Sequence, residues 1–193
     1  APLLRLWRID RDQYVALAAA LGVMILGVVD GMLLAVALSI VAILQRMATP
    51  KLVVLGRLNG SHDFVEASQA GVDVDPRIEI LRPTQPLFFA NADDVLADVV
   101  ARMKANGAAE AAILSLEETS SLDSTTLDAL IECDARLKAL GRRLYLARVK
   151  QSVARTLAAA GADDLAKRAA QNFSVSDAWK AAIAALAEKT SRA

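Results

Sequence analysis

Hydrophobic and polar positions divide the chain into two unlike regions. From Tyr14 to Leu44 there are 31 residues with a single charge, at Asp30. A straight helix of that length would measure roughly 46 Å, which exceeds a hydrocarbon core of about 30 Å. From Lys51 onward, charged and apolar residues are mixed as in an ordinary globular domain. The pattern therefore predicts a membrane-inserted segment followed by a domain outside the bilayer.

The apolar run is interrupted at Val29-Asp30-Gly31, and Asp-Gly is a common turn signal. A split there gives two helices, Tyr14–Val28 and Met32–Arg46, each shorter than the ~20 residues that span a bilayer comfortably. A single tilted helix would instead place Asp30 inside the bilayer at a cost of at least ~2.5 kcal/mol. We therefore expect a transmembrane or re-entrant helical hairpin over residues 1–48. In it, Asp30 is a turn residue or a functional intramembrane acid.

Cations flank the apolar run on both sides. They are Arg5, Arg8 and Arg11 before it, and Arg46, Lys51 and Arg57 after it. Cytoplasmic flanks favour Lys and Arg, so a hairpin with both ends in the cytoplasm fits better than a single pass. Helices this short need lipid and neighbouring helices around them, so we expect the remainder of a membrane domain as a partner. The alternative is a buried helical hairpin in the core of a soluble protein.

Small residues along the apolar run suit close packing between membrane helices. They are Ala18, Ala19, Ala20, Gly22, Gly27, Gly31 and Ala35.

Beyond Pro50 the pattern predicts alternating strands and helices. The expected strands are Leu52–Gly56, Ile78–Arg82, Leu87–Ala90, Ala111–Leu116 and Arg143–Ala147. A polar loop is expected from Asn59 to Pro76, with a helical turn around Phe64–Ala70.

The expected helices have recognisable start and stop residues. One begins with Asn91 as N-cap and Asp94 in a capping box, and ends at Asn106-Gly107. The next is capped by Asp123 or Ser124 and ends at Gly141, and two more cover Val153–Ala160 and Val175–Glu188. The fold class is therefore a mixed β-sheet covered by α-helices over residues 49–193.

Composition argues against several classes of function. The formal net charge is zero and aromatic residues do not interleave with basic ones, so nucleic acid is not an expected partner. Cys133 and His62 are the only residues of their kinds, which leaves no intramolecular disulfide and no conventional zinc site. We also expect no cofactor. No nucleophile–base pair or phosphate-binding loop is present, so we expect no catalytic residues. Cys133 falls in a predicted helix and is expected to be buried.

Four short motifs stand in order along the second region. They are Val53-Val54-Leu55-Gly56-Arg57 after Ala48-Thr49-Pro50, Ile80-Leu81-Arg82-Pro83, Pro86-Leu87-Phe88-Phe89-Ala90-Asn91-Ala92, and Leu122-Asp123-Ser124-Thr125-Thr126-Leu127. In this order and spacing they resemble the C-terminal part of a sulfate-permease-type (SulP) anion transporter, with its last membrane helices and its STAS domain. The resemblance covers nearly the whole chain.

The resemblance implies a function for the whole protein. It implies a multi-pass carrier of the inner membrane that moves sulfate, bicarbonate, chloride or dicarboxylates. The STAS domain would lie in the cytoplasm and serve regulation and homodimer assembly. An alternative is a membrane-anchored STAS signalling module that binds a partner protein or a nucleotide and transports nothing.

The Asp123-Ser124 pair is the candidate regulatory site. Anti-sigma-factor antagonists, which carry a related domain, have an Asp-Ser pair at this helix start, and the serine is phosphorylated. A helix N-terminus can hold a phosphate or another anion, so Asp123, Ser124 and Thr125 together form a candidate phosphorylation or anion site. Thr126 stands where the antagonists usually have glycine, which counts against close approach by a partner. The simpler interpretation is that Asp123 or Ser124 only caps the helix.

Two further features bear on charge. Glu117 and Glu118 add negative charge close to the candidate site. The Arg142-Arg143 pair follows a predicted helix end and is expected to match the negative end of that helix dipole.

Overall fold

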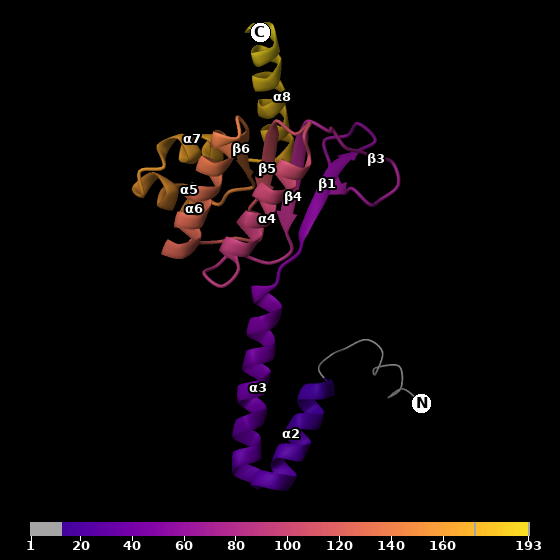
Figure 1. The fold of residues 1–193 in the computed structure, drawn as a ribbon, viewed down its shortest axis with the longest axis vertical. Helices are drawn as coiled ribbons and strands as arrows, with labels where there is room; N and C mark the ends of the chain where they lie inside the picture. Colours follow the sequence, from indigo (N-terminus) through magenta and orange to yellow (C-terminus); the bar gives the residue numbers. More distant parts are fainter. Residues whose placement is uncertain (1–12, 172, 193) are drawn as a thin grey trace. The chain divides into compact units, whose positions relative to one another are not determined.

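The computed structural model of the chain describes residues 13–171 and 173–192. It divides into two compact units between Thr49 and Pro50 (Figure 1). The first is a helical hairpin and the second an α/β domain, and each is described by itself.

The first unit consists of helices α2 (Gln13–Leu26) and α3 (Val28–Ala48). The chain reverses at Gly27, whose φ of 91° lies in the region that favours glycine. The sequence prediction of a hairpin is correct, but the predicted turn at Val29-Asp30-Gly31 is wrong. Asp30 lies in the first turn of α3, where a carboxylate faces the positive end of the helix dipole.

Gly31 has a packing role instead. A methyl group at this position would lie 2.5 Å from the backbone nitrogen of Val23, so only glycine allows the two helices to approach this closely. This is the kind of close contact for which the small residues of the apolar run were predicted.

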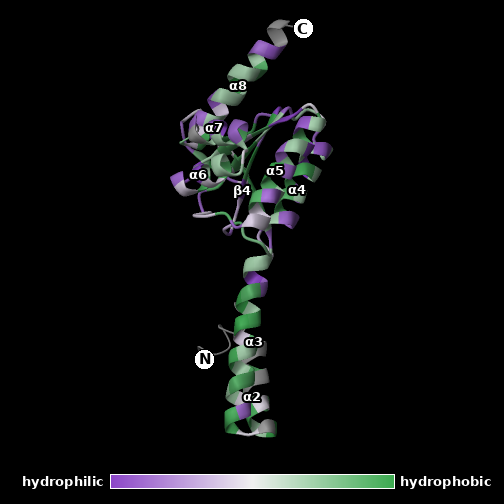
Figure 2. Cartoon of the chain, turned by 90° about the vertical axis from the view of Figure 1, so that its left-hand side faces the viewer, coloured by the Kyte–Doolittle hydropathy of each residue, from purple (hydrophilic) through white to green (hydrophobic). Residues whose placement is uncertain are grey.

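Helix α3 is long and apolar enough to cross a membrane, with 21 residues and a mean hydropathy of 2.2 over its best window. No other helix among the described residues meets that test. Most residues along the ribbon of α3 are coloured as hydrophobic in Figure 2.

The second unit is built on a six-stranded mixed sheet. Its strands are β1 (Leu52–Leu58), β2 (Phe64–Glu66), β3 (Val72–Asp73), β4 (Ile78–Pro83), β5 (Ala111–Ser115) and β6 (Arg143–Ala147). The order is β2-β1-β4-β5-β6, and β3 also pairs with β1. Strands β4, β5 and β6 are parallel, and β1 is antiparallel to its neighbours.

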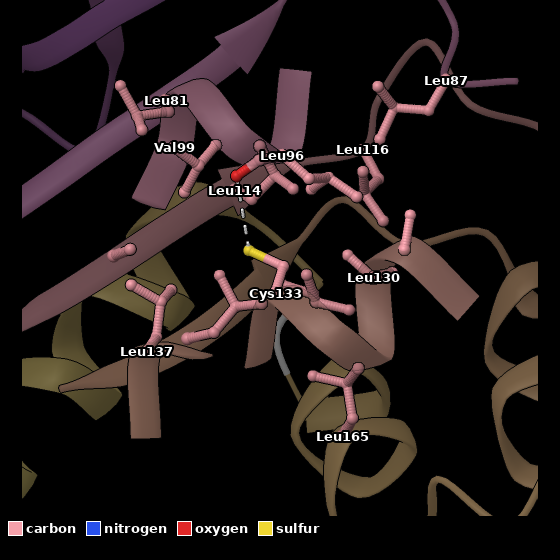
Figure 3. Close-up of a cluster of buried hydrophobic side chains, with 14 of the residues drawn as sticks. Leu81, Leu87, Leu96, Val99, Leu114, Leu116, Leu130, Cys133, Leu137 and Leu165 are labelled. Atoms are coloured by element: carbon pink, nitrogen blue, oxygen red, sulfur yellow. Dashed lines mark hydrogen bonds between the residues drawn. The ribbon is translucent and has the colours of Figure 1, made fainter. Parts of the chain in front are cut away.

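Helices cover both faces of this sheet, as predicted. They are α4 (Ala92–Ala105), α5 (Ser124–Ala139), α6 (Gln151–Ala159), α7 (Asp163–Gln171) and α8 (Val175–Arg192). One face packs against α4 to α7 in the larger core cluster, part of which is drawn in Figure 3. The other face packs against α8 through Val175, Ala178, Ala182 and Leu186. Because both faces are covered, all five residues of β5 are buried.

Cys133 lies in the larger cluster, as expected for a lone cysteine in an amphipathic helix. It is 2% exposed, and its Sγ approaches the carbonyl oxygen of Leu96 at 3.9 Å (Figure 3). Burial, followed by the nearby charge of Asp134, raises the pKa of the thiol to about 12.

Two local predictions are wrong. The helical turn expected around Phe64–Ala70 is instead a flap made of β2 and β3, both paired with β1. The guanidinium of Arg57 holds the turn between β1 and β2 by donating hydrogen bonds to the carbonyl oxygens of Gly60 and Ser61. The strand expected at Leu87–Ala90 is a loop.

Candidate functional site

The candidate site lies at the carboxyl ends of the parallel strands. The loop after β5 leads to the N-terminus of α5, and the short loop after β6 leads to the N-terminus of α6. Residues 84–91, which follow β4, lead to the N-terminus of α4. Open sheets with parallel strands commonly bind ligands at this edge.

Asp123 joins two of these loops. It is the N-cap of α5, with φ −81° and ψ 171°, and its Oδ1 accepts a hydrogen bond from the backbone N–H of Thr126 at 2.8 Å. Its Oδ2 accepts from the backbone N–H of Phe89 at 2.9 Å. The predicted helix cap is therefore confirmed, and the same carboxylate also holds the loop before α4.

These hydrogen bonds determine the charge state of Asp123. Burial alone would raise the pKa of the carboxyl, but the hydrogen bonds from Thr126 and Phe89 outweigh it and lower the pKa below its ordinary value of 3.8. The group is therefore a carboxylate at neutral pH.

The loop at 86–91 replaces strand pairing with side-chain acceptors. The N–H of Leu87 donates to Thr119 Oγ1 at 3.0 Å, and that of Phe88 donates to Asn91 Oδ1 at 3.0 Å. The side-chain amide of Asn91 donates to the carbonyl oxygen of Pro86 at 3.0 Å. With these donors satisfied, the segment has no need of a neighbouring strand.

Asn91 therefore differs from its predicted role. It occupies the N-cap position of α4 but makes no side-chain capping bond to that helix. Its side chain is turned onto the preceding loop, so the capping box with Asp94 does not form. Thr119 was not among the predicted site residues, because nothing in its local sequence shows that it meets a loop 32 residues away.

Ser124 and Thr125 are exposed beside Asp123, on the first turn of α5. The structure therefore brings the three predicted site residues together at one helix start. Phe89 is 65% exposed, and its ring stacks edge-to-face against Phe88 with centroids 5.3 Å apart. Asp123, which directly precedes Ser124 and Thr125, is therefore hydrogen-bonded to a loop with an exposed aromatic ring.

Charges around the helix start are mostly negative. Glu117 forms an ion pair with Arg148 at 2.8 Å, while Glu118 is exposed. Arg148 has a φ of 54°, an unusual value for a residue other than glycine. The carboxylate of Asp123 itself occupies this helix start, so the arrangement does not favour tight binding of a free anion.

Asp30 belongs to the other unit and is exposed on α3. No group of three or more His, Cys, Asp or Glu residues suited to a metal ion occurs in the described part of the chain.

The family model that matches is that of the STAS domain, over residues 69–178. A relative named "Probable sulfate transporter", from Mycobacterium tuberculosis strain H37Rv, is 37% identical over 161 residues, covering 81% of this chain and 28% of the relative. Another with that description, from Arabidopsis thaliana, is 34% identical over 95 residues, covering 46% of this chain and 14% of the relative. The chain thus spans less than a third of the length of these curated relatives.

The fold of both units recurs in a solved structure. The murine Solute Carrier 26 family member A9 anion transporter, in an inward-facing state, matches with a TM-score of 0.81 at 21% identity. The match covers 94% of this chain and 30% of the murine chain.

Proposed function

The chain belongs to the STAS domain family, and from this membership we propose that it is the C-terminal segment of a secondary anion transporter. The family and the fold class agree with the resemblance found from the four sequence motifs. The proposed cargo of the whole protein is an inorganic or small organic anion of the sulfate, bicarbonate or dicarboxylate class. The named relatives are transporters, not enzymes.

One observation carries this proposal. The match to the mycobacterial relative covers 81% of the chain, which is more than the second unit contains, so it extends into the apolar hairpin before Pro50. A similarity confined to the α/β unit would be equally compatible with a separate signalling domain. Similarity that includes an apolar helix supports a transporter in which the two units follow one another.

The proposed organisation follows the division of the chain. Residues 1–48 would close the membrane domain as a transmembrane or re-entrant hairpin, in contact with lipid and with the rest of that domain. Residues 49–193 would form the cytoplasmic STAS domain of a multi-pass inner-membrane protein. Asp30 would then be an intramembrane acid, because the turn itself falls at Gly27.

The STAS domain would serve regulation and homodimer assembly. Within it, Ser124 is the proposed point of regulation, since its hydroxyl is exposed while the neighbouring carboxylate is occupied by two backbone N–H groups. A phosphate there would add about −1.5 to −2 charge beside the Phe89 loop. In uptake assays Ser124→Asp is expected to change the rate, whereas Ser68→Asp, which adds the same charge at an exposed serine between β2 and β3, serves as the control that leaves it unaltered.

The native polypeptide provides the direct test. An antibody against residues 111–193 should detect a membrane protein that resists alkaline washing and is much larger than the 20.5 kDa of this chain. Reconstituted in proteoliposomes, that protein should take up radiolabelled sulfate. A native polypeptide of about 20.5 kDa, or one removed by alkali, would overturn the proposal in favour of a partner-binding STAS module.

A further inference from the structure

A second polar cavity lies at the opposite, amino-terminal ends of β5 and β6. It has a volume of about 680 Å³, within the range of small-ligand sites. Its lining includes Arg142 and Arg143 at the start of β6, the ring of Tyr145, and Lys189 on α8. It is separate from the Asp123 site, which lies at the carboxyl ends of the same strands.

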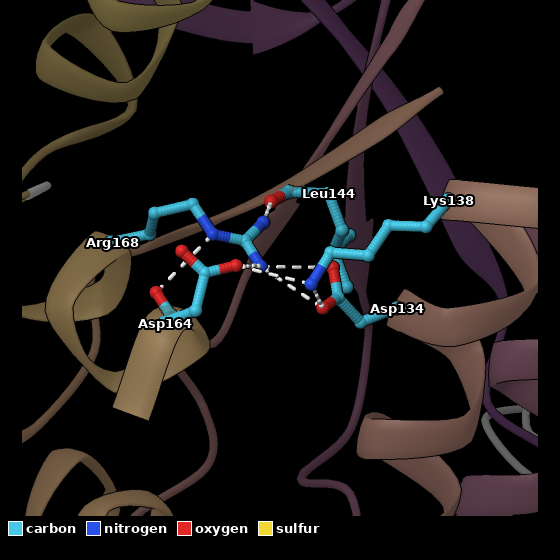
Figure 4. A network of polar contacts seen from close by, with 5 residues as sticks. All are labelled: Asp134, Lys138, Leu144, Asp164 and Arg168. Atoms are coloured by element: carbon cyan, nitrogen blue, oxygen red, sulfur yellow. Dashed lines mark hydrogen bonds and ion pairs between the residues drawn. The ribbon is translucent and has the colours of Figure 1, made fainter. Parts of the chain in front are cut away.

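Most charges near this cavity are already paired. Arg168 donates to both carboxylate oxygens of Asp134 at 3.0 and 2.9 Å, and to Asp164 at 3.2 Å (Figure 4). Lys138 pairs with the same two carboxylates at 2.9 and 3.0 Å (Figure 4). Lys189 pairs with Glu110 at 3.0 Å. This network neutralises its own charge and fixes the wall formed by α5 and α7.

Arg142 and Arg143 differ from the other cations that line the cavity. Neither side chain makes an ion pair or hydrogen bond with a residue that the structure describes. Nη1 of Arg142 is buried without an acceptor among those residues. Among the acids that line the cavity, Glu188 is the one without an ion pair to a described residue. Its negative charge therefore offsets one of the two positive charges of Arg142 and Arg143.

A buried donor without an acceptor loses its hydrogen bonds to water without replacement, and this penalty is larger when the donor is charged. The helix C-terminus before Arg142 does not supply the acceptor, because the carbonyl groups of its last turn already receive backbone N–H groups. Leu137 accepts from Arg142, and Lys138 accepts from Gly141. The interaction with the helix dipole that the sequence predicts for Arg142 therefore does not provide a hydrogen-bond acceptor for its guanidinium group.

We propose that this cavity binds a doubly charged tetrahedral oxyanion, sulfate or phosphate, through the guanidinium groups of Arg142 and Arg143. The planar fork of N–H donors on arginine matches the oxygens of such an anion. Ala111, Tyr145 and Leu186 form an apolar part of the adjoining wall. Binding is independent of the transport proposal. Only its consequence, a response of the STAS domain to the cytoplasmic anion level, rests on that proposal.

Calorimetric titration of the full chain in a non-ionic detergent tests the site. Sodium sulfate and sodium phosphate are titrated separately, with ionic strength held constant by sodium chloride. We expect saturable binding of at least one of the two anions. The anion with the lower dissociation constant is the one that the site prefers. Arg142→Gln should weaken the affinity for that anion at least tenfold. Arg142→Lys should weaken it less, because lysine keeps the positive charge but lacks the planar set of N–H donors.

Arg155→Gln is the matched control. Arg155 is an exposed arginine on α6 with no ion pair among the described residues, and its loss should alter the affinity less than twofold. If Arg142→Gln does not melt cooperatively, the exposed Arg143→Gln replaces it and should also weaken binding. Absence of saturable binding of either anion, or an equal loss in Arg155→Gln, would overturn the proposal.

Discussion

Asp123 uses each of its carboxylate oxygens for a different segment, one for its own helix and one for the Phe89 loop. Asp123→Ala removes both acceptors and is expected to lower the free energy of unfolding by about 1–2 kcal/mol, the size of a lost N-cap. Urea unfolding followed by circular dichroism measures this. Ser124→Ala, at the neighbouring exposed position, should change stability by less than about 0.5 kcal/mol.

The same carboxylate predicts a dependence on pH. Because the pKa of Asp123 is lower in the folded state than its ordinary 3.8, its charge stabilises the fold above that value. The contribution is lost as the pH falls through the folded-state pKa. The stability difference between the native chain and Asp123→Asn should therefore be constant near pH 7 and shrink below about pH 4. A difference that stays constant from pH 7 to pH 3 would show that charge plays no part.

Cys133 is expected to be chemically inert while the domain is folded. With a pKa near 12 and 2% exposure, the thiol is neither ionised nor accessible at pH 8. Iodoacetamide should label it only at the rate at which the domain unfolds, and labelling should become fast in urea. Rapid labelling of the native chain would mean that the helix α5 region opens readily.

At the scale of elements, Arg168 connects α7 to α5 and β6. Its guanidinium contacts Asp134, which is 6% exposed, and donates to the carbonyl oxygen of Leu144 (Figure 4). Arg168→Met leaves that carboxylate with only Lys138, so we expect a loss of about 2–4 kcal/mol in the free energy of unfolding. The double variant Arg168→Met/Asp134→Leu should recover part of this loss, because it removes the buried charge as well. A double variant less stable than the single one would contradict the explanation.

Gly31 sets the distance between α2 and α3. Gly31→Ala forces a methyl group against the backbone of Val23, which cannot move as a side chain can. We expect a loss of about 1–3 kcal/mol in helix packing, measured as a lower melting temperature of the detergent-solubilised chain. Gly22→Ala is the control, since its methyl group would meet the flexible end of Leu34 at 3.1 Å and approach the backbone of Gly31 only at the ordinary contact distance of 3.8 Å. Equal effects of both substitutions would argue against this packing.

The sequence predicts elements well where the information is local. Strand β6 was expected at Arg143–Ala147 and occurs there, because a continuous apolar run bounded by Gly141 and a charged residue has few alternatives. The cap at Asp123 or Ser124 is likewise predicted from local sequence, because Asp and Ser directly before a helical pattern are typical N-cap residues. The segment Leu87–Ala90 was misassigned because its partners, Thr119 and Asp123, lie 32 and 34 residues away. A similar limit applies to the hairpin turn, since the Asp-Gly signal does not reveal that Gly31 is needed for packing.

At the scale of the whole molecule, apolar exposure is confined almost entirely to the hairpin. Of nineteen exposed large hydrophobic residues among those described, fifteen lie between Leu17 and Met47. The four others, Val74, Phe89, Leu140 and Phe173, are scattered over the α/β unit. Isolated apolar side chains are normal on a soluble surface, whereas a continuous apolar surface requires lipid or protein around it.

Removal of residues 1–49 should therefore abolish the need for detergent. The second unit has its own sheet, covered on both faces by its own helices, and the core clusters found among the described residues contain none from before Leu52. A fragment from Pro50 to Ala193 is expected to elute as a discrete species in detergent-free buffer and to unfold cooperatively on heating, while the full chain aggregates under those conditions. The matched comparison is a full chain in which Leu33, Val36 and Ile40 are replaced by serine. If the apolar helix surface causes the aggregation, that variant should aggregate less than the native sequence. An insoluble fragment beside a soluble full chain would place the boundary between the units elsewhere.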